Sequence, residues 1–465
     1  MRFLDRVDEM SRLLRLSDER RGGFAAIWGR RRIGKSALLQ EWCRRSEGLY
    51  AVADQTAAAV QREELAAVLE SRFPGFAEVR YPTWKALLNA LSRRADAENW
   101  HGPLSLDEFP YLVESDDSLP SVFQNWVDGE KRRGGIVTAI AGSSQHMMQG
   151  LVMEADSPLY GRADEKIKLG PIGIKFIAEA LGLSNPVDMI MAYSVWGGVP
   201  RYWVAAERFG KDLERALDEL VLNPLGIFHE EPTTLLHSEI PSAVGLKPYL
   251  DVVGSGVNRV SEIAGRLGVP ATALSRPLAR LVDLGLVRRE VPFGESEKGS
   301  KKSIYKLADP FCKFWFRVLA ARRTVFAGAP EKVRRAVWRA QSEQVFASEW
   351  EDLCRRCVAN SSVLSGLAGK NDYWLPAGRW WSGNEGEWDV VSRNGSGTKV
   401  LLGEVKWSRT PFDARKVEAL CRALVARPAP KCFLGEKVRV LFLPEVAKGV
   451  RPTGGVVIES LELRA

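Results

Sequence analysis

The feature that most constrains the fold of this chain is the string Gly29-Arg30-Arg31-Arg32-Ile33-Gly34-Lys35-Ser36. A short apolar run, residues 24 to 28, comes directly before it, and a helical pattern, residues 37 to 42, comes directly after it. A glycine-containing loop between a buried strand and a helix is the context in which a phosphate-binding loop works. A chance match on an ordinary strand-loop-helix is the alternative. Since the motif and its flanking elements agree, the string predicts an α/β domain.

The residue types of this loop explain what it can bind. Gly29 and Gly34 let the backbone curl, so that its N–H groups and the start of the next helix cradle phosphates. Lys35 is predicted to reach the β and γ phosphates, and Ser36 to coordinate Mg²⁺. The expected ligands are therefore ATP and Mg²⁺. The candidate nucleotide-binding residues of the loop are Gly29, Arg30, Arg31, Arg32, Ile33, Gly34, Lys35, Ser36 and Ala37.

Acidic partners for this loop follow a brief apolar strand that starts at Leu104. Asp107 is predicted to hold the metal, directly or through water, and Glu108 to polarise the attacking water. Pro103 and Ser105 shorten the apolar run, so a pair of exposed turn carboxylates is the alternative.

A second strand, residues 135 to 141, is predicted to end in Gly142-Ser143-Ser144. A hydroxyl there would lie at the carboxyl edge of the sheet, where the γ phosphate is expected. Ser143 or Ser144 is therefore a candidate sensor of the γ phosphate, although a Gly-Ser turn that closes the strand explains the same spacing.

Composition bounds the remaining classes. The chain has 465 residues, of which 45% are hydrophobic and 27% charged, so it can bury several cores and is not disordered. The net charge of +8 permits an acidic partner such as nucleic acid, as a supporting argument only. No run approaches the ~20 apolar residues that span a bilayer, and the first residues lack the apolar core of a signal peptide. We therefore expect a cytoplasmic protein with no membrane partner.

Cysteine usage gives no sign of a disulfide framework. Cys354 and Cys357 form a CxxC pair in a helical stretch, with no second pair and no nearby His. Because zinc needs four ligands, we expect these two thiols to serve ordinary packing.

The middle of the chain predicts a winged helix-turn-helix, with helices at 260–268 and 271–284 and strands at 285–291 and 303–307. Residues 254–309 hold ten Lys or Arg and six Asp or Glu, a net charge of +4, which suits duplex DNA. A structural or oligomerisation module is the alternative, and a proline at position 277 is expected to bend the second helix. The candidate DNA-binding residues are Ser275, Arg276, Arg280, Lys298, Lys301 and Lys302.

Beyond about residue 330 the predicted elements follow the order αβββαβ, which is that of the restriction-endonuclease-like fold. They are a helix at 342–359, strands at 373–375, 387–392 and 399–406, a helix at 414–426 and a strand at 438–443.

The strands of this region carry a PD-(D/E)xK constellation. Alternation places Glu404 and Lys406 on one face, and the intervening hairpin brings Asp389 alongside. Asp389 and Glu404 are predicted to bind Mg²⁺, and Lys406 to orient or deprotonate the nucleophile. Glu349 is the candidate additional acid, preferred slightly to Glu351. A degenerate nuclease fold that docks or holds DNA is the alternative.

Several strings together resemble the archaeal-type ATPases, an AAA-related class of signal-transducing (STAND) P-loop proteins. Besides the P-loop they are Phe3 to Glu9, Asp107 to Leu112, Gly142 to Ser144, Ser157 to Arg162, Trp196 to Tyr202 and Tyr305 to Phe316. The resemblance implies a three-layer α/β ATPase core with a helical extension, a winged helix and a restriction-endonuclease-like domain. It also makes Arg162 the candidate arginine finger or γ-phosphate sensor, in its own subunit or across a subunit boundary. By position alone Arg162 is equally a surface residue.

These observations divide the chain into an ATPase core (1–170), a helical extension (171–240), a winged helix-turn-helix (241–325) and a nuclease-like domain (330–465). The first hypothesis is that nucleotide state or assembly controls a Mg²⁺-dependent nuclease on double-stranded DNA. The second is an ATP-driven regulatory switch whose C-terminal domain only binds nucleic acid or protein. A homo-oligomer is compatible with both hypotheses.

Overall fold

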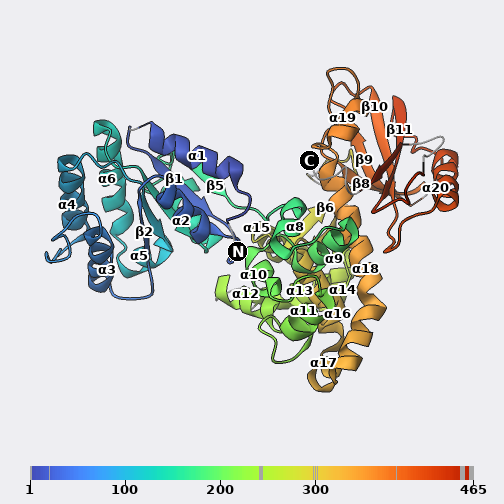
Figure 1. Ribbon diagram of the computed structural model, residues 1–465, viewed down its shortest axis with the longest axis horizontal. Coiled ribbons are helices and arrows are strands. Elements are labelled where there is room, and N and C mark those ends of the chain that lie inside the picture. The colour runs from blue at the N-terminus through green and yellow to red at the C-terminus, as the bar shows by residue number, and fades with distance from the viewer. Residues whose placement is uncertain are drawn as a thin grey trace. The chain divides into compact units, whose positions relative to one another are not determined.

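The computed structural model describes residues 3–19, 21–239, 245–296, 298, 300, 302–383, 385–450 and 456–459. The chain forms two compact units, whose helices and strands are labelled in Figure 1. The first unit contains Met1–Ile172, Val199–Arg201 and His237–Pro241. The second contains Gly173–Gly198, Tyr202–Leu236 and Ser242–Ala465.

The first unit is built on a five-stranded sheet in the order β2-β3-β4-β1-β5, and every neighbouring pair is parallel (Figure 1). All residues of β1, β3 and β4 are buried, as expected for a parallel sheet that is covered on both faces. The predicted α/β fold with a parallel sheet is therefore confirmed. The strands are β1 (Phe24–Trp28), β2 (Leu49–Val52), β3 (Leu104–Asp107), β4 (Thr138–Gly142) and β5 (Glu165–Lys168).

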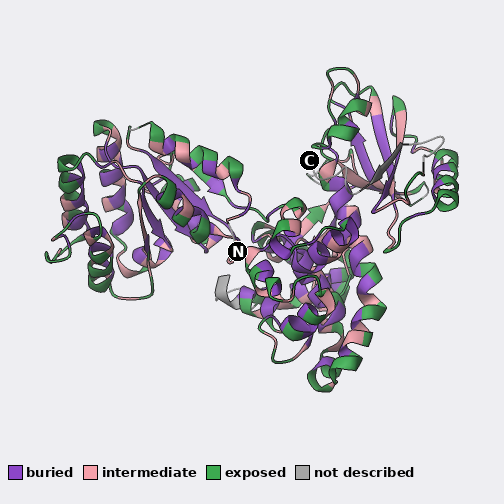
Figure 2. Cartoon of the chain, viewed as in Figure 1, coloured by how far each residue is buried: buried purple, intermediate pink, exposed green. Residues whose placement is uncertain are grey.

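Helices connect these strands and bury their apolar faces. In α4, for example, Leu87, Leu88 and Leu91 are buried, and Thr83 closes the N-terminus by accepting the Ala86 N–H at 3.2 Å. Figure 2 shows buried strands and exposed outer helix surfaces. The helices are α1 (Val7–Asp18), α2 (Lys35–Arg45), α3 (Ala58–Glu70), α4 (Trp84–Ala97), α5 (Phe109–Ser115), α6 (Leu119–Arg133) and α7 (Gln145–Met153).

The second unit is mainly helical in its first part. Its core there is aromatic: Tyr202, Phe228 and Phe311 pack ring against ring. The helices up to the second sheet are α8 (Ile177–Leu181), α9 (Pro186–Trp196), α10 (Pro200–Glu207), α11 (Leu213–Leu217), α12 (Glu231–Glu239), α13 (Lys247–Gly254), α14 (Val260–Leu267), α15 (Ser275–Asp283), α16 (Pro310–Val318), α17 (Arg323–Gly328) and α18 (Glu331–Cys357).

The region predicted as a winged helix folds as α13, α14 and α15 followed by an antiparallel hairpin of β6 (Val287–Glu290) and β7 (Ile304–Leu307). The predicted second helix is interrupted: a 3-10 turn at Ala271–Leu274 leads into α15. Pro277 is the third residue of α15, where a backbone N–H has no partner within the helix. The predicted helix is thus divided just before Pro277, which lies in the first turn of α15 and not in a helix interior.

The second sheet has the order β12-β11-β10-β9-β8 (Figure 1). β8, β9 and β10 are antiparallel neighbours, whereas β10, β11 and β12 run parallel. α20 packs on β11. The elements are α19 (Ser362–Ala368), β8 (Gly378–Ser382), β9 (Gly386–Arg393), β10 (Lys399–Val405), α20 (Ala414–Ala426), β11 (Glu436–Leu443) and β12 (Val456–Glu459).

Three predicted elements of this domain need correction. The strand predicted at 373–375 is only a single bridge between Trp374 and Asn394, because Pro376 cannot donate a ladder hydrogen bond. The first strand of the sheet is β8 instead, and β12 was not predicted. The helix predicted to start at 342 begins at Glu331, directly after Pro330.

Candidate functional site

The phosphate-binding loop lies between β1 and α2, as predicted, and its glycines are required by its geometry. Gly34 has a φ of +98°, a conformation that side chains with a Cβ rarely adopt. A Cβ on Gly29 would lie 2.7 Å from the carbonyl oxygen of Leu169. A larger residue is therefore disfavoured at Gly34 by the backbone conformation and at Gly29 by lack of space.

Lys35 is buried at the start of α2, and its ammonium turns back into the loop. Its Nζ donates to the carbonyl oxygens of Gly29 at 3.0 Å and Arg30 at 3.2 Å. The ammonium thus lies inside the curl in which phosphates are expected.

The hydroxyl of Ser36 and the carboxylate of Asp107 meet across the sheet edge. Ser36 Oγ donates to Asp107 Oδ2 at 2.5 Å, and the Tyr50 hydroxyl donates to the same oxygen at 2.8 Å. Burial and the Asp107 charge raise the pKa of Tyr50, so its phenol keeps the proton that it donates. A hydroxyl and a carboxylate side by side are the oxygen ligands that Mg²⁺ prefers, and these residues fit the ion.

Glu108 follows directly, and its carboxylate is held by the end of the neighbouring strand. Its Oε2 accepts hydrogen bonds from the backbone N–H of Ser143 at 3.1 Å and from Ser143 Oγ at 3.0 Å. Ser144 caps α7 by accepting the Met147 N–H at 3.4 Å. Of the two candidate serines, Ser143 is the one that meets the acidic pair.

Two further residues support the loop. The buried Arg6 donates through Nη2 to the carbonyl oxygens of Ile33 at 2.9 Å and Gly170 at 2.7 Å, which ties the loop to the segment after β5. Pro200 lies beside the loop, because its Cγ would be 3.6 Å from a Cβ on Gly34. The chain turns at the end of α9, where Gly197 has a φ of +56°.

Arg162 lies at the wrong edge of the sheet to sense the γ phosphate of its own subunit. It precedes β5, and the register pairs Glu165 with Ala25 near the start of β1. The loop begins at Gly29, four residues further along β1, or about 13 Å at ~3.3 Å per residue, and Arg162 precedes Glu165 on the side away from it. Arg162 Nε instead donates to Asp128 at 3.2 Å. The expectation of a sensor within the same subunit is therefore wrong, whereas a role across a subunit boundary stays a prediction.

In the second unit, the predicted residues of the PD-(D/E)xK constellation come together where the end of β10 lies beside the middle of β9. Asp389 Oδ2 accepts the Val405 N–H at 2.9 Å. Burial raises the pKa of Asp389, opposed by that hydrogen bond and reinforced by the charge of Glu404. Lys406 Nζ donates to Glu404 Oε1 at 2.6 Å.

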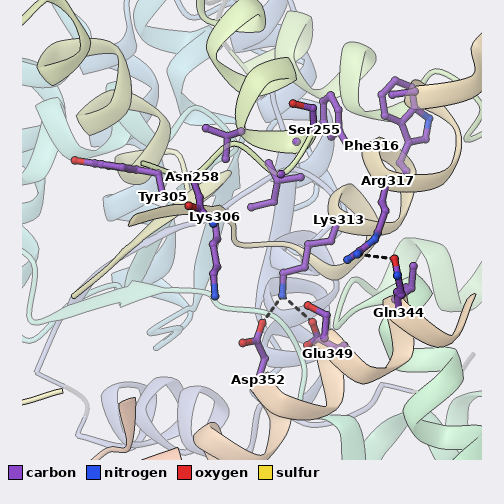
Figure 3. Close-up of a pocket in the computed structure, with 18 of the residues that line it drawn as sticks. Ser255, Asn258, Tyr305, Lys306, Lys313, Phe316, Arg317, Gln344, Glu349 and Asp352 are labelled. Carbon is purple, nitrogen blue, oxygen red and sulfur yellow. Dashed lines mark hydrogen bonds and ion pairs between the residues drawn. The ribbon is translucent and has the colours of Figure 1, made fainter. Parts of the chain in front are cut away.

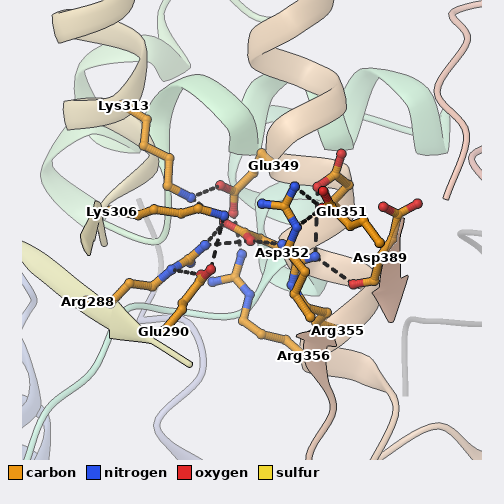
Figure 4. Close-up of polar contacts among 12 residues, drawn as sticks. Arg288, Glu290, Lys306, Lys313, Glu349, Glu351, Asp352, Arg355, Arg356 and Asp389 are labelled. Atoms are coloured by element: carbon orange, nitrogen blue, oxygen red, sulfur yellow. Dashed lines mark hydrogen bonds and ion pairs between the residues drawn. The ribbon is translucent and has the colours of Figure 1, made fainter. Parts of the chain in front are cut away.

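Of the two candidate acids on α18, Glu351 and not the preferred Glu349 is the one on which the charge of Asp389 acts. Glu349 accepts from Lys313 at 2.8 Å and pairs with Arg356. Glu351 is the acid of α18 that acts on Asp389: burial and the Asp389 charge raise the pKa of Glu351 (Figure 4). The preference for Glu349 is therefore wrong.

A metal ion does not fit this carboxylate group as it is arranged. Glu404 uses both oxygens for cations, Lys406 on one and Arg427 on the other. Within the described ranges no set of three or more His, Cys, Asp or Glu side chains is placed to hold a metal ion. The guanidinium of Arg427 also lies over the ring of Trp388 at 4.4 Å, so the carboxylate is neutralised by an arginine that is itself anchored.

The predicted DNA-binding residues lie on α15 and around the hairpin. Ser275, Arg276 and Arg280 are exposed, as are Lys298 and Lys302. Lys302 pairs with Glu295 at 2.6 Å. Lys301 lies outside the described residues.

Comparison with known proteins finds relatives of the N-terminal part of the chain. Residues 3–205 match the family described as an ATPase domain predominantly from Archaea. This part of the chain is similar to archaeal-type ATPase domains. Residues 315–419, beyond the ATPase domain, match a family described as archaeal and bacterial proteins of unknown function.

Relatives of the ATPase domain extend over the rest of the chain. An uncharacterized protein of Methanocaldococcus jannaschii is 27% identical over 412 residues, which cover 87% of each chain. The Walker-type ATPase of Pyrococcus abyssi is 20% identical, with a TM-score of 0.53 over 68% of this chain and 96% of that one. This likeness shows a shared fold. Of the helices in the described ranges, none combines the length and apolar character that a bilayer span needs.

Two functional contacts have no signal in the sequence. Tyr50 reaches Asp107 only because β2 pairs with β3 in the register Val52 to Asp107. Arg427 reaches Glu404 from the segment after α20. Arg6, in contrast, belongs to the string Phe3 to Glu9. Because this string resembles the family, it indicated that Arg6 lies in a functional segment.

Proposed function

We propose that this protein is an ATP-driven switch: its ATPase domain binds and hydrolyses MgATP, and the nucleotide state sets how its C-terminal half engages duplex DNA. The observation that carries the proposal is the pair of Ser36 and Asp107 at 2.5 Å, with Glu108 next in the chain. A loop lysine, two metal ligands and an acid for the attacking water form a full hydrolytic set.

Each residue has one task in this proposal. Lys35 exchanges two loop carbonyls for phosphate oxygens, which carry more negative charge. Ser36 and Asp107 hold the ion, and bound Mg²⁺ neutralises charge on the phosphates. Glu108 orients the attacking water once its carboxylate leaves Ser143.

Duplex DNA is proposed as the partner because of the charge and exposure of α15. Arg276 and Arg280 are one helical turn apart and share a face, and both are exposed. Residues 254–309 carry a net charge of +4, which favours a phosphate backbone. Phosphate contacts of this kind position a duplex and make binding sensitive to salt.

A second candidate function is DNA cleavage by the C-terminal domain. The observation that favours it is the raised pKa of Glu351, which is caused by burial and by the neighbouring Asp389 charge, because carboxylates perturbed in this way are common at functional sites. The pairing of Glu404 with Arg427 opposes it. We therefore place the switch first.

Anisotropy of a fluorescent DNA duplex with the full chain tests the switch. Replacing both arginines (Arg276→Ala with Arg280→Ala) should weaken binding at least about tenfold and flatten the salt dependence. The exposed Lys332, on α18, gives the control Lys332→Ala, which should bind as wild type. ATP should shift the affinity of wild type but not of Lys35→Ala. Equal binding by the arginine variant, or no effect of ATP, contradicts the proposal.

Incubation of the same duplex with Mg²⁺ or Mn²⁺, with and without ATP, separates the two candidates. The switch predicts an intact duplex. Cleavage that disappears in Asp389→Ala would establish the second candidate in its place.

A further inference from the structure

The second unit contains a cavity of about 950 Å³. Residues of α13, β7, α16 and α18 line it (Figure 3), and Arg379 of β8 is also part of the lining. Small-molecule sites in proteins have volumes of ~300–1,000 Å³, so this cavity can take an organic ligand with room for water. It lies wholly within the second unit and shares no residue with the phosphate-binding loop.

The charge of the lining is unbalanced. Eight basic side chains but only four acidic ones face the cavity. The basic residues are Lys247, Arg288, Lys306, Lys313, Arg317, Arg323, Arg355 and Arg379, and the acidic ones are Asp251, Glu349, Glu351 and Asp352. A concave, partly desolvated surface with this excess attracts anions.

The acids on α18 pair mainly with basic residues of the same lining, which outnumber them, so a positive excess remains. Asp352 accepts from Arg288 at 2.6 Å and pairs with Lys313 and Arg355 as well (Figure 4). Glu349 is shared by Lys313 and Arg356. Because the single Asp352 carboxylate contacts three cations, this cluster keeps a net positive charge.

Two basic side chains of the lining are only weakly held by their present partners. Arg317 is exposed and donates to a neutral amide, Gln344 Oε1, at 2.8 Å (Figure 3). Lys306 pairs with Glu290 at 3.0 Å, but that carboxylate also serves Arg288 at 2.7 Å. Burial lowers the pKa of Lys306 despite the attraction of Glu290, so a second anion would stabilise its charged form.

The rest of the lining suits an organic group attached to an anion. Tyr305 and Phe316 offer aromatic surface, and small polar side chains lie beside them, Asn258 near Tyr305 and Ser255 near Phe316 (Figure 3). Mostly aromatic or apolar walls with a few converging polar groups are typical of metabolite sites.

We infer that this cavity binds a phosphorylated small molecule of about nucleotide size, with its phosphate facing Lys306, Lys313 and Arg317 and its ring against Tyr305 and Phe316. The site is separate from the ATP site. Its wall also contains Arg355, which donates to the carbonyl oxygen of Asp389 at 2.8 Å. A ligand there would therefore touch the helix that borders the nuclease-like carboxylates.

Calorimetric titration of the full chain tests the site, in the Lys35→Ala background so that the P-loop does not contribute. AMP and pyrophosphate are the probes. Arg317→Ala and Lys306→Met should each weaken binding at least about tenfold, since each removes a charged donor to phosphate. Lys332→Ala, on α18 but outside the cavity, is the matched control and should bind like its parent.

Two results would overturn the inference: saturable binding of neither probe, or binding that both cavity variants retain in full. ATP turnover of Arg317→Ala, measured with an intact P-loop, keeps the two proposals apart. Because Arg317 has no part in hydrolysis, its loss should leave turnover at the wild-type rate, so failure at the cavity would say nothing against the ATPase.

Discussion

Replacing Glu108 with glutamine is the sharpest perturbation of the proposed hydrolytic site. The amide has the shape of the carboxylate, and its Oε1 can still accept from the Ser143 N–H and hydroxyl, now 3.1 and 3.0 Å from Glu108 Oε2. Each bond to a charged acceptor is worth about 1.5–3 kcal/mol and each neutral bond about 1 kcal/mol. Because this site is half-exposed, we expect a loss of stability of only about 1 kcal/mol, and the variant should fold.

The Glu108→Gln substitution should lower the rate of ATP turnover far more than it lowers the stability of the fold. An amide cannot take a proton from water, and a positioned general base is worth about 10²- to 10⁴-fold in rate. We therefore expect Glu108→Gln to lower kcat by at least about 100-fold while ATP affinity stays near wild type, because Lys35, Ser36 and Asp107 are untouched. Phosphate release under saturating MgATP measures the first quantity, and titration with a fluorescent ATP analogue measures the second. Wild-type turnover in this variant would refute the role given to Glu108.

Three further predictions concern the rest of the chain. Arg334 makes a bidentate pair with the buried Asp218 at 2.8 and 2.7 Å. Arg334→Ala should therefore lower the free energy of unfolding, measured by urea titration, by about 3 kcal/mol. The control is Arg339→Ala, which removes an exposed pair with Glu214 and should change that free energy little. The pKa of Asp389 is raised in the folded state, so its contribution to stability is present at low pH and is lost as the pH rises through the folded value. Asp389→Asn should therefore raise the melting temperature at pH 7 and lose that advantage near pH 4; an equal shift at both values would contradict the assignment. Arg162→Ala should leave ATP affinity unchanged, since Arg162 lies at the sheet edge opposite the loop, and weaker binding in a nucleotide titration would show that it reaches the site.

The parts of the site that could be predicted are those whose residues lie close together in the sequence. The P-loop is eight contiguous residues between a strand and a helix, so the chain itself sets the positions of Gly34, Lys35 and Ser36. Asp107 and Glu108 follow the same logic, because the carboxyl ends of parallel strands share one edge of the sheet. The order of those strands is what the sequence does not encode in any simple pattern, and Tyr50 was missed for that reason.

The choice between Glu349 and Glu351 shows a second limit. Residues two apart on a helix point roughly 200° apart, at ~3.6 residues per turn, so only one of them can face the sheet. Both positions have apolar and charged neighbours, and nothing in the spacing decides between them. In the structure Glu349 is occupied by Lys313 and Arg356, residues whose placement depends on how α16 and α18 pack.

Arg427 illustrates why a motif alone does not establish a metal centre. Asp389, Glu404 and Lys406 are present with the expected spacing, and strand pairing brings them together. Arg427, which comes from another segment, then pairs with the Glu404 carboxylate and neutralises the charge that a metal ion would otherwise neutralise. Short motifs specify the residues of a site, whereas the surrounding chain decides their state.

The most direct test of the central claim is ATP hydrolysis by the purified full chain, compared with Lys35→Ala. The account predicts phosphate release that depends on Mg²⁺ in the wild type and is abolished in the variant, because the loop lysine is the group that reaches the phosphates. Hydrolysis that survives the loss of Lys35, or a wild-type chain that binds no nucleotide, would contradict it.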